Sequence, residues 1–137
     1  MKTLFIFYTY TGNTKQLAQE LLAGAVDADI TEVKDIRRPG KLKAYSLGCL
    51  AAMRGKAWPI RQLEADLAAY DHLILLAPVW AGNPPPAVNG LFEQLPEGKT
   101  VSVKMISASG HSNCKERLEA LIKAKGGILK SFKDVKV

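Results

Sequence analysis

Short apolar runs alternate with helical patterns along this chain, and the alternation limits the folds that it can adopt. Residues 3–8 and 72–77 are almost continuously apolar, which is typical of strands buried on both faces of a parallel sheet. Further strands are expected at 29–34, 100–106 and 128–133, and helices at 14–25, 41–54, 62–69, 84–94 and 114–124. Because parallel strands need crossover connections, this order predicts an α/β sheet with helices on both faces.

The composition of the runs also places some strands within the sheet. The run at 29–34 is short and less apolar, which favours an edge, whereas 72–77 is expected at the centre. The chain stops after the fifth strand with no final helix, which leaves one face of that strand uncovered. Either lysines protect this edge from pairing, or a second subunit covers it in a homodimer. The lysines are Lys130, Lys133 and Lys136.

The ends of the last helix carry recognisable signals. Asn113 and Glu116 resemble a capping box at its start, in which each side chain accepts a backbone N–H from the other residue. Gly126 and Gly127 are expected to end the helix, because glycine adopts the left-handed conformation of a helix end.

Length and composition describe one ordinary domain, residues 1–137, which is long enough to bury a core. No apolar run approaches the roughly 18 residues of a membrane span, so none is expected. The first residues lack a small-residue cleavage site and lead directly into a strand, so no signal peptide is expected. Two cysteines make no disulfide framework, which predicts a cytoplasmic protein.

The net charge of +6 is confined to one segment, residues 35–62, which holds seven bases and one acid. The rest of the chain is neutral, so no nucleic-acid partner is expected. On one interpretation the bases attract an acidic partner protein or the phosphates of a nicotinamide cofactor. On the other, they are the solvated face of a helix that packs through Leu42, Tyr45, Leu50 and Met53.

A run of hydroxyl side chains around Gly12 separates the first strand from the first helix. Backbone N–H groups at a helix start point outward, and the helix dipole favours an anion there. Threonine hydroxyls can donate further hydrogen bonds to phosphate oxygens. Two other loops, 78–83 and 107–113, follow strands at the same edge of the expected sheet, where ligands of such folds bind.

Three segments resemble the flavodoxin family of FMN proteins. Residues 8–14 (YTYTGNT) are similar to the family's phosphate loop, and residues 70–84 (YDHLILLAPVWAGNP) resemble its third strand and first flavin loop. Residues 107–113 (SASGHSN) resemble the second flavin loop in position and composition. The resemblance implies a flavodoxin-like, three-layer, doubly wound fold with five parallel strands in the order 2-1-3-4-5. The final helix is expected to be absent from this chain.

The resemblance also implies FMN as the cofactor and a role for each loop residue. The side chains of Thr9, Thr11, Asn13 and Thr14, with backbone N–H groups of Tyr10 and Gly12, would bind the phosphate. Pro78, Val79, Trp80, Ala81 and Gly82 would line the isoalloxazine ring, and Ser107, Ser109, Gly110, His111 and Asn113 would approach its pyrimidine edge. The alternatives are a plain turn at Gly12, a core tryptophan at Trp80 and an ordinary loop histidine at His111. Cys49 and Cys114 are expected to be packed, and no metal site is expected.

Three functions follow from these features. The first is an electron carrier in which non-covalently bound FMN transfers electrons between partners and no side chain is catalytic. The second is an FMN-dependent NAD(P)H or quinone oxidoreductase. The third is a flavin-less module of the same fold. Flavodoxins are typically acidic around the flavin, whereas residues 35–62 are basic, so an acidic redox partner or NAD(P)H is expected.

Overall fold

The computed structural model describes residues 2–137 and contains a five-stranded parallel sheet in the order β2-β1-β3-β4-β5. This confirms the predicted order, with β2 at an edge and β3 at the centre. The strands are β1 (Thr3–Phe7), β2 (Ala28–Glu32), β3 (His72–Pro78), β4 (Thr100–Ser107) and β5 (Ile128–Lys136). Every neighbouring pair is parallel, so all five strands end at one edge of the sheet.

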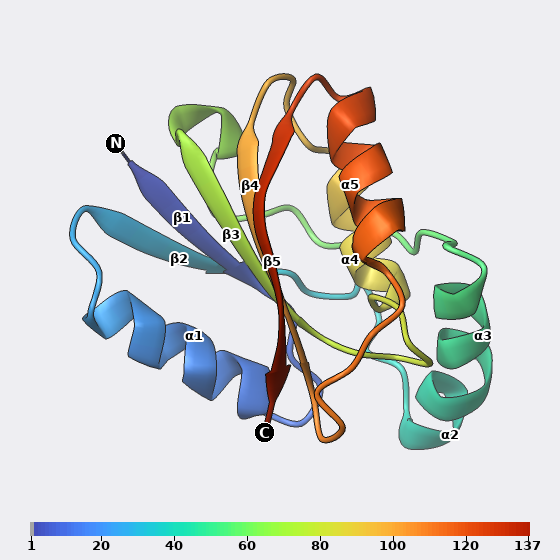
Figure 1. Ribbon diagram of the computed structural model, residues 1–137. Helices are drawn as coiled ribbons and strands as arrows, with labels where there is room; N and C mark the ends of the chain where they lie inside the picture. The colour runs from blue at the N-terminus through green and yellow to red at the C-terminus, as the bar shows by residue number, and fades with distance from the viewer. Residues whose placement is uncertain (1) are drawn as a thin grey trace.

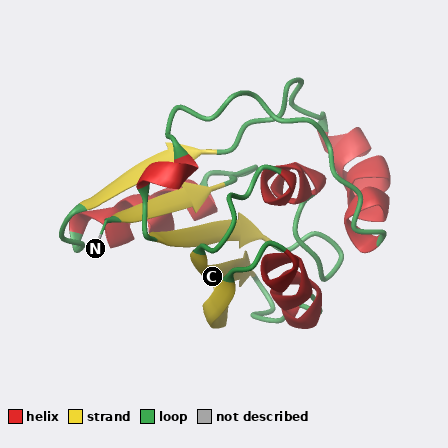
Figure 2. Ribbon diagram, turned by 90° about the horizontal axis from the view of Figure 1, so that it is seen from above, coloured by secondary structure: helices red, strands yellow, loops and turns green. Residues whose placement is uncertain are grey.

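Helices cover the two faces of the sheet in a three-layer arrangement (Figures 1 and 2). Helix α1 (Asn13–Ala23) lies on one face, and α4 (Pro86–Glu93) with α5 (Lys115–Ala124) lies on the other. Residues of β1 alternate between the two layers: Phe5 and Phe7 pack in the cluster of α1, whereas Leu4 and Ile6 pack in the cluster of α4 and α5. Two apolar layers therefore hold the sheet rigidly beneath its carboxyl edge.

The basic segment forms a helix that is set apart from these layers, at the right of Figure 1. It consists of α2 (Lys41–Lys43), the π-helical turn η1 (Ala44–Gly48) and α3 (Cys49–Met53). Its inward face carries small residues, since Ala44, Gly48, Ala51 and Ala52 are buried. Below, this continuous helix of residues 41–53 is called the insert helix.

The prediction that the insert helix packs through its large apolar side chains is wrong. Leu42 and Tyr45 are both 84% exposed, and Leu50 and Met53 are also exposed. The reason is a close approach: a Cβ atom on Gly48 would lie 2.7 Å from Cζ3 of Trp80. Only small residues fit against the loop that follows β3, so the large apolar side chains face outward.

Two further local predictions are corrected. Residues 62–69 do not form a helix; only the short 3₁₀ turn η2 (Leu67–Ala69) is present, where the Asp66 carboxylate accepts the Ala68 N–H at 3.1 Å. Leu63 and Ala65 instead pack against the core from an extended segment. The predicted capping box is also absent, since α5 begins after Cys114 without a side-chain cap.

The other predicted helices and strands are present, with bounds that differ by a few residues. The N–H of Gly126 donates to Lys123 and that of Gly127 to Ile122, so the two glycines end α5 as expected. Strand β5 continues to Lys136, beyond the predicted end, and forms the second edge of the sheet. Within residues 2–137, no helix is both long enough and apolar enough to cross a membrane.

Candidate functional site

The loop between β1 and α1 turns sharply at Gly12, which adopts a left-handed backbone with φ of 102°. Its N–H donates to Oγ1 of Thr9 at 3.0 Å, which closes the turn. A Cβ atom at Gly12 would meet no atom within 4 Å, so the backbone conformation and not crowding requires glycine. Helix α1 then starts at Asn13, where the first N–H groups have no acceptor within the helix. The loop therefore presents backbone donors to an anion.

The side chains predicted to bind phosphate differ in how accessible they are. Thr11 and Asn13 are exposed, and Thr9 is half-buried. Thr14 is only 3% exposed, because it lies on the inner side of the first turn of α1.

The loop after β3 is a tight turn closed by two backbone hydrogen bonds. The N–H of Trp80 donates to the Asn83 carbonyl at 2.7 Å, and the N–H of Asn83 donates to the Trp80 carbonyl at 3.0 Å. Between them Ala81 and Gly82 both have positive φ, of 50° and 81°. Two successive left-handed residues are the pattern of a type I′ turn. This turn holds the backbone of residues 80–83 in one geometry at the carboxyl edge of the sheet.

Trp80 lies in an aromatic cluster and also lines an open pocket. Its ring contacts Tyr8 and Tyr10 edge-on, with centroid distances of 6.0 and 5.8 Å. The pocket has a volume of about 590 Å³. It is lined by Tyr10, Val79, Trp80 and Ala81, and by Lys41, Ala44, Tyr45 and Cys49 of the insert helix. Trp80 therefore packs partly against the core and partly lines the pocket. Cys49 is half-buried at the pocket wall, whereas it was expected to be fully packed.

The third loop, residues 107–113, lies directly against the second. The N–H of Asn113 donates to the Gly82 carbonyl at 2.7 Å, and a Cβ on Gly82 would lie 2.7 Å from Nδ2 of Asn113. Within the loop, Oγ of Ser107 accepts the N–H of Gly110 at 2.9 Å, and Oγ of Ser109 accepts the N–H of His111 at 3.2 Å. His111 itself is exposed.

All three predicted loops thus meet at the carboxyl edge of the sheet. Three neighbouring strands bring these loops together. Thr9 and Tyr10 follow β1, Pro78 ends β3 and Ser107 ends β4, and the parallel register places these ends side by side. Gly12 connects the first loop to α1, and Asn113 connects the third loop to the Gly82 turn. Cys114, immediately after, is fully buried, and burial raises the pKa of its thiol, as expected for a packed residue.

Arg38 of the basic segment also reaches the site, although it was not among the predicted site residues. Its guanidinium carbon lies 4.6 Å from the centre of the Tyr10 ring, and its Nη2 donates to the Tyr10 carbonyl. The Tyr10 hydroxyl in turn donates to the Pro39 carbonyl at 2.9 Å. A positive charge is thereby fixed against the phosphate loop. Arg38 reaches this place because it follows β2, whose carboxyl end neighbours that of β1.

A buried pair beneath the loop was also missed. The Tyr8 hydroxyl donates to the Asp35 carboxylate at 2.6 Å, and Asp35 is 8% exposed. Burial, together with the neighbouring Asp35 carboxylate, raises the pKa of Tyr8 far above its ordinary value. Tyr8 therefore remains a neutral donor, and it anchors the start of the basic segment to the end of β1.

Comparison with known proteins decides the family. A family model described as NADPH-dependent FMN reductase matches residues 1–130, nearly the whole chain. The chain belongs to this family. It is therefore a flavodoxin-like FMN protein, which confirms the resemblance and the cofactor predicted from the three loops.

Solved structures of flavoproteins share the fold of this chain. The flavoprotein of Lactobacillus acidophilus in complex with FMN is 24% identical, with a TM-score of 0.77, over 96% of this chain and 91% of that one. The apo-form of the flavoprotein from the same organism is 26% identical, with a TM-score of 0.70, over 97% and 92% of the two chains. Oxidised flavodoxin 1 of Bacillus cereus is 17% identical, with a TM-score of 0.58, over 100% and 84%.

The residues of this reductase-family member fit FMN chemically. Backbone donors and hydroxyls surround the start of α1, as a phosphate requires. The adjoining pocket of about 590 Å³ has an aromatic wall and lies within the size range of cofactor sites. Two loops with fixed backbones border it. The donor set and the flat, apolar wall thus match the two ends of FMN.

Proposed function

We propose that this protein is an oxidoreductase that holds FMN non-covalently and takes electrons from NADPH. The match of residues 1–130 to NADPH-dependent FMN reductases carries this proposal. When bound, FMN supplies a ring that accepts a hydride from NADPH and passes electrons on. The protein supplies binding, orientation and electrostatics.

We assign the phosphate to the first loop. Thr9, Thr11 and Asn13 are at its accessible side, Thr14 is at its inner side, and Tyr10 and Gly12 contribute backbone N–H groups. Arg38 supports this loop through the Tyr10 carbonyl and adds a positive charge beside it. The geometry fixes the loop before a ligand arrives, which reduces the entropy cost of binding.

We assign the flavin ring to the edge formed by Pro78, Val79, Trp80, Ala81 and Gly82, with residues 107–113 at its polar end. The contact between Asn113 and Gly82 holds the two loops at a fixed separation. N–H groups of such loops favour the uptake of negative charge by a neighbouring ring, because they cost no reorganisation. Tyr45 and Cys49 of the insert helix line the apolar pocket beside Trp80.

No ionisable side chain is required for proton transfer in this arrangement. Tyr8 keeps its proton because its pKa is raised, and it is already bonded to Asp35. His111 is exposed on the third loop.

An electron carrier is the second candidate, favoured by the charge of residues 35–62. Seven bases and one acid in this segment would attract an acidic redox partner protein. Electron transfer to such a partner should then slow as ionic strength rises, because exposed charges are screened over about 10 Å at 0.1 M salt.

Steady-state oxidation of NADPH by the purified FMN-loaded protein in air, with oxygen as the electron acceptor, separates the two candidates. Turnover in the absence of any other protein supports the reductase. If NADPH is consumed only after a separate reductase is added, the protein is a carrier, and the reductase proposal is wrong.

A further inference from the structure

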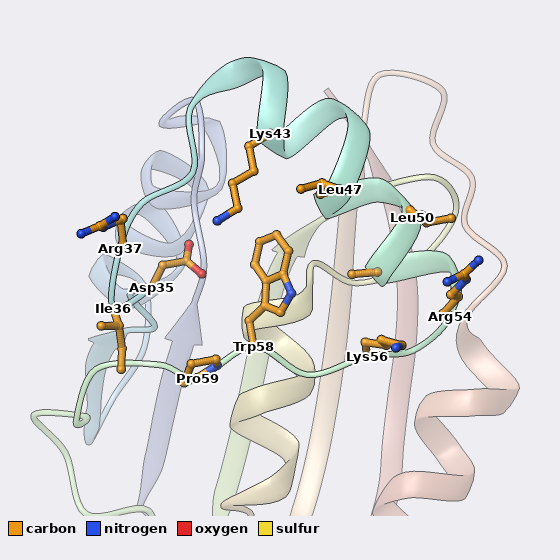
Figure 3. A pocket seen from close by; sticks show the side chains of 11 residues that line it. Asp35, Ile36, Arg37, Lys43, Leu47, Leu50, Arg54, Lys56, Trp58 and Pro59 are labelled. Carbon is orange, nitrogen blue, oxygen red and sulfur yellow. The ribbon is translucent and has the colours of Figure 1, made fainter.

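A second cleft lies on another face of the insert helix, away from the FMN pocket. Lys43, Leu47, Leu50, Ala51 and Arg54 line it from the helix, whereas Lys41, Ala44, Tyr45 and Cys49 line the FMN pocket. The opposite wall is the return segment 56–59, and residues 35–37 close one end. Its volume is about 540 Å³, which is enough for a nucleotide-sized ligand. Figure 3 shows this cleft.

The floor of the cleft is aromatic and apolar. The Trp58 ring stands at its centre, between the insert helix and segment 56–59 (Figure 3). The backbone N–H of Trp58 donates to the Pro86 carbonyl at 3.0 Å, which fixes this residue to the start of α4. Leu47 and Leu50 are 56% and 42% exposed above it. A flat ring placed here would cover apolar surface that is now open to water.

Four bases surround this floor. Lys43 extends from the helix toward Trp58, with its Nζ 5.6 Å from the ring centroid, while Arg54 and Lys56 lie together at one end and Arg37 at the other (Figure 3). In the chain from Lys2 onward, the ion pair formed is Lys2–Asp29, so none of these four bases has a carboxylate partner. Anions are therefore attracted to both ends of the cleft.

The one acid of the cleft is already bonded. Asp35 is 8% exposed, and its carboxylate accepts the Tyr8 hydroxyl at 2.6 Å. Its backbone carbonyl accepts Nε of Arg61 at 3.1 Å. At the other end, Arg117 of α5 donates to the carbonyls of Ala52 and Met53, both at 3.1 Å, and holds the end of the helix in place. The walls are thus fixed by contacts that leave the four bases free.

We propose that this cleft binds a flat aromatic ring that carries a phosphate group, at the same time as FMN occupies its own site. Trp58 would stack on the ring, and Lys43 with the neighbouring bases would bind the phosphate through charge-assisted hydrogen bonds. The ligand comes either from the adenosine end of NADPH, with its 2′-phosphate, or from a free nucleotide. Only the first source rests on the proposed function; the binding itself does not.

Calorimetric titration of the FMN-saturated protein with adenosine 2′,5′-bisphosphate tests the proposal. We expect binding without release of FMN, which the visible spectrum of the flavin monitors. The double variant Lys43→Gln/Lys56→Gln should weaken binding roughly tenfold or more, because it removes two charge-assisted contacts. Both side chains are exposed, and the backbone bonds of Lys56 remain, so the fold should be kept.

The matched control is Lys123→Gln/Lys133→Gln, which removes the same charge from exposed positions on α5 and β5. This control should bind the bisphosphate like the wild type. Equal binding by wild type and Lys43→Gln/Lys56→Gln would overturn the proposal, as would displacement of FMN or an equal loss in the control.

The kinetics of the same variants identify the source of the ligand. A raised KM for NADPH with an unchanged KM for NADH in Lys43→Gln/Lys56→Gln identifies the adenosine end of NADPH. Loss of bisphosphate binding with both KM values unchanged identifies a free nucleotide. If the protein does not oxidise NADPH at all, the proposed function fails, but the titration still decides whether the cleft binds its ligand.

Discussion

The guanidinium of Arg38 lies over the ring of Tyr10, 4.6 Å from its centre, and donates a hydrogen bond to the Tyr10 carbonyl. The two residues are 28 positions apart, and the contact joins the basic segment to the phosphate loop. It places one positive charge where the phosphate of FMN is proposed to bind. Of the other bases, Lys41 lies on the insert helix, Arg61 donates to the Asp35 carbonyl, and the remaining four line the second cleft.

Replacing Arg38 should therefore weaken FMN binding. We expect Arg38→Gln to lose roughly tenfold in affinity, because both the charge and a hydrogen bond to the loop are removed. Arg38→Lys should restore only part of this, since an ammonium cannot stack and bond as a guanidinium does. Titration of the apoprotein with FMN measures both variants. Arg37→Gln is the control, and an equal loss in that variant would show a general charge effect instead.

Thr14 allows a test of the inner side of the loop. Thr14→Ala should weaken FMN binding by on the order of 1–3 kcal/mol, because a phosphate donor is lost. Since Thr14 is only 3% exposed, Thr14→Val separates the hydroxyl from packing, and Thr14→Ser keeps the hydroxyl. The Thr14→Val variant should bind FMN as weakly as Thr14→Ala does, and Thr14→Ser should bind it nearly as well as the wild type. Wild-type affinity in Thr14→Val would contradict the assigned role.

The Gly82 turn should be sensitive to a single methyl group. Gly82 has φ of 81°, and a Cβ there would lie 2.7 Å from Nδ2 of Asn113. Gly98 has φ of 73° but no atom within 4 Å of such a Cβ, so Gly98→Ala is a matched control. Gly98→Ala should cost about 1–2 kcal/mol of unfolding free energy from backbone strain alone.

Gly82→Ala should cost more than that control, and it should also reduce FMN affinity because the contact between the two loops is disturbed. Urea denaturation and FMN titration of the two variants give the comparison. Equal destabilisation, with FMN affinity unchanged in both, would mean that the contact between Gly82 and Asn113 does not shape the site.

His72 makes stability depend on pH at the opposite edge of the sheet. Burial lowers the pKa of His72, with a further contribution from Lys130, and its Nε2 lies 2.8 Å from Oγ of Ser102. The unfolded chain therefore binds a proton at a higher pH than the folded protein does. The free energy of unfolding should fall as the pH drops through about 6.5, the ordinary histidine value.

The variant His72→Gln should lose this part of the pH dependence. Denaturation curves at about pH 5 and pH 8, on either side of the ordinary histidine pKa, provide the comparison. If the variant loses as much stability as the wild type between these values, another group is responsible.

Much of the fold could be predicted because its signals are local. The apolar runs around Leu4 and Leu75 identify buried strands without knowledge of their neighbours. The Gly12 turn was likewise visible, because a glycine between hydroxyls separates a strand from a helix. The same local signals led to the three loops that are proposed to bind FMN.

The errors arose where a distant contact decides the outcome. Leu42 and Tyr45 face solvent because Gly48 packs against Trp80, and no helical pattern contains that contact. Residues 62–69 have helical composition, but Leu63 reaches the core from an extended segment. Arg38 was not assigned to the site because Tyr10 is distant in the chain.

The most direct test mixes the FMN-loaded protein with NADPH in the absence of oxygen and of any other protein. We predict that the visible absorbance of the flavin bleaches, at a rate fast enough to support the steady-state oxidation of NADPH. An absorbance that stays unchanged until a separate reductase is added would contradict the proposal that this protein is an NADPH-dependent flavin reductase.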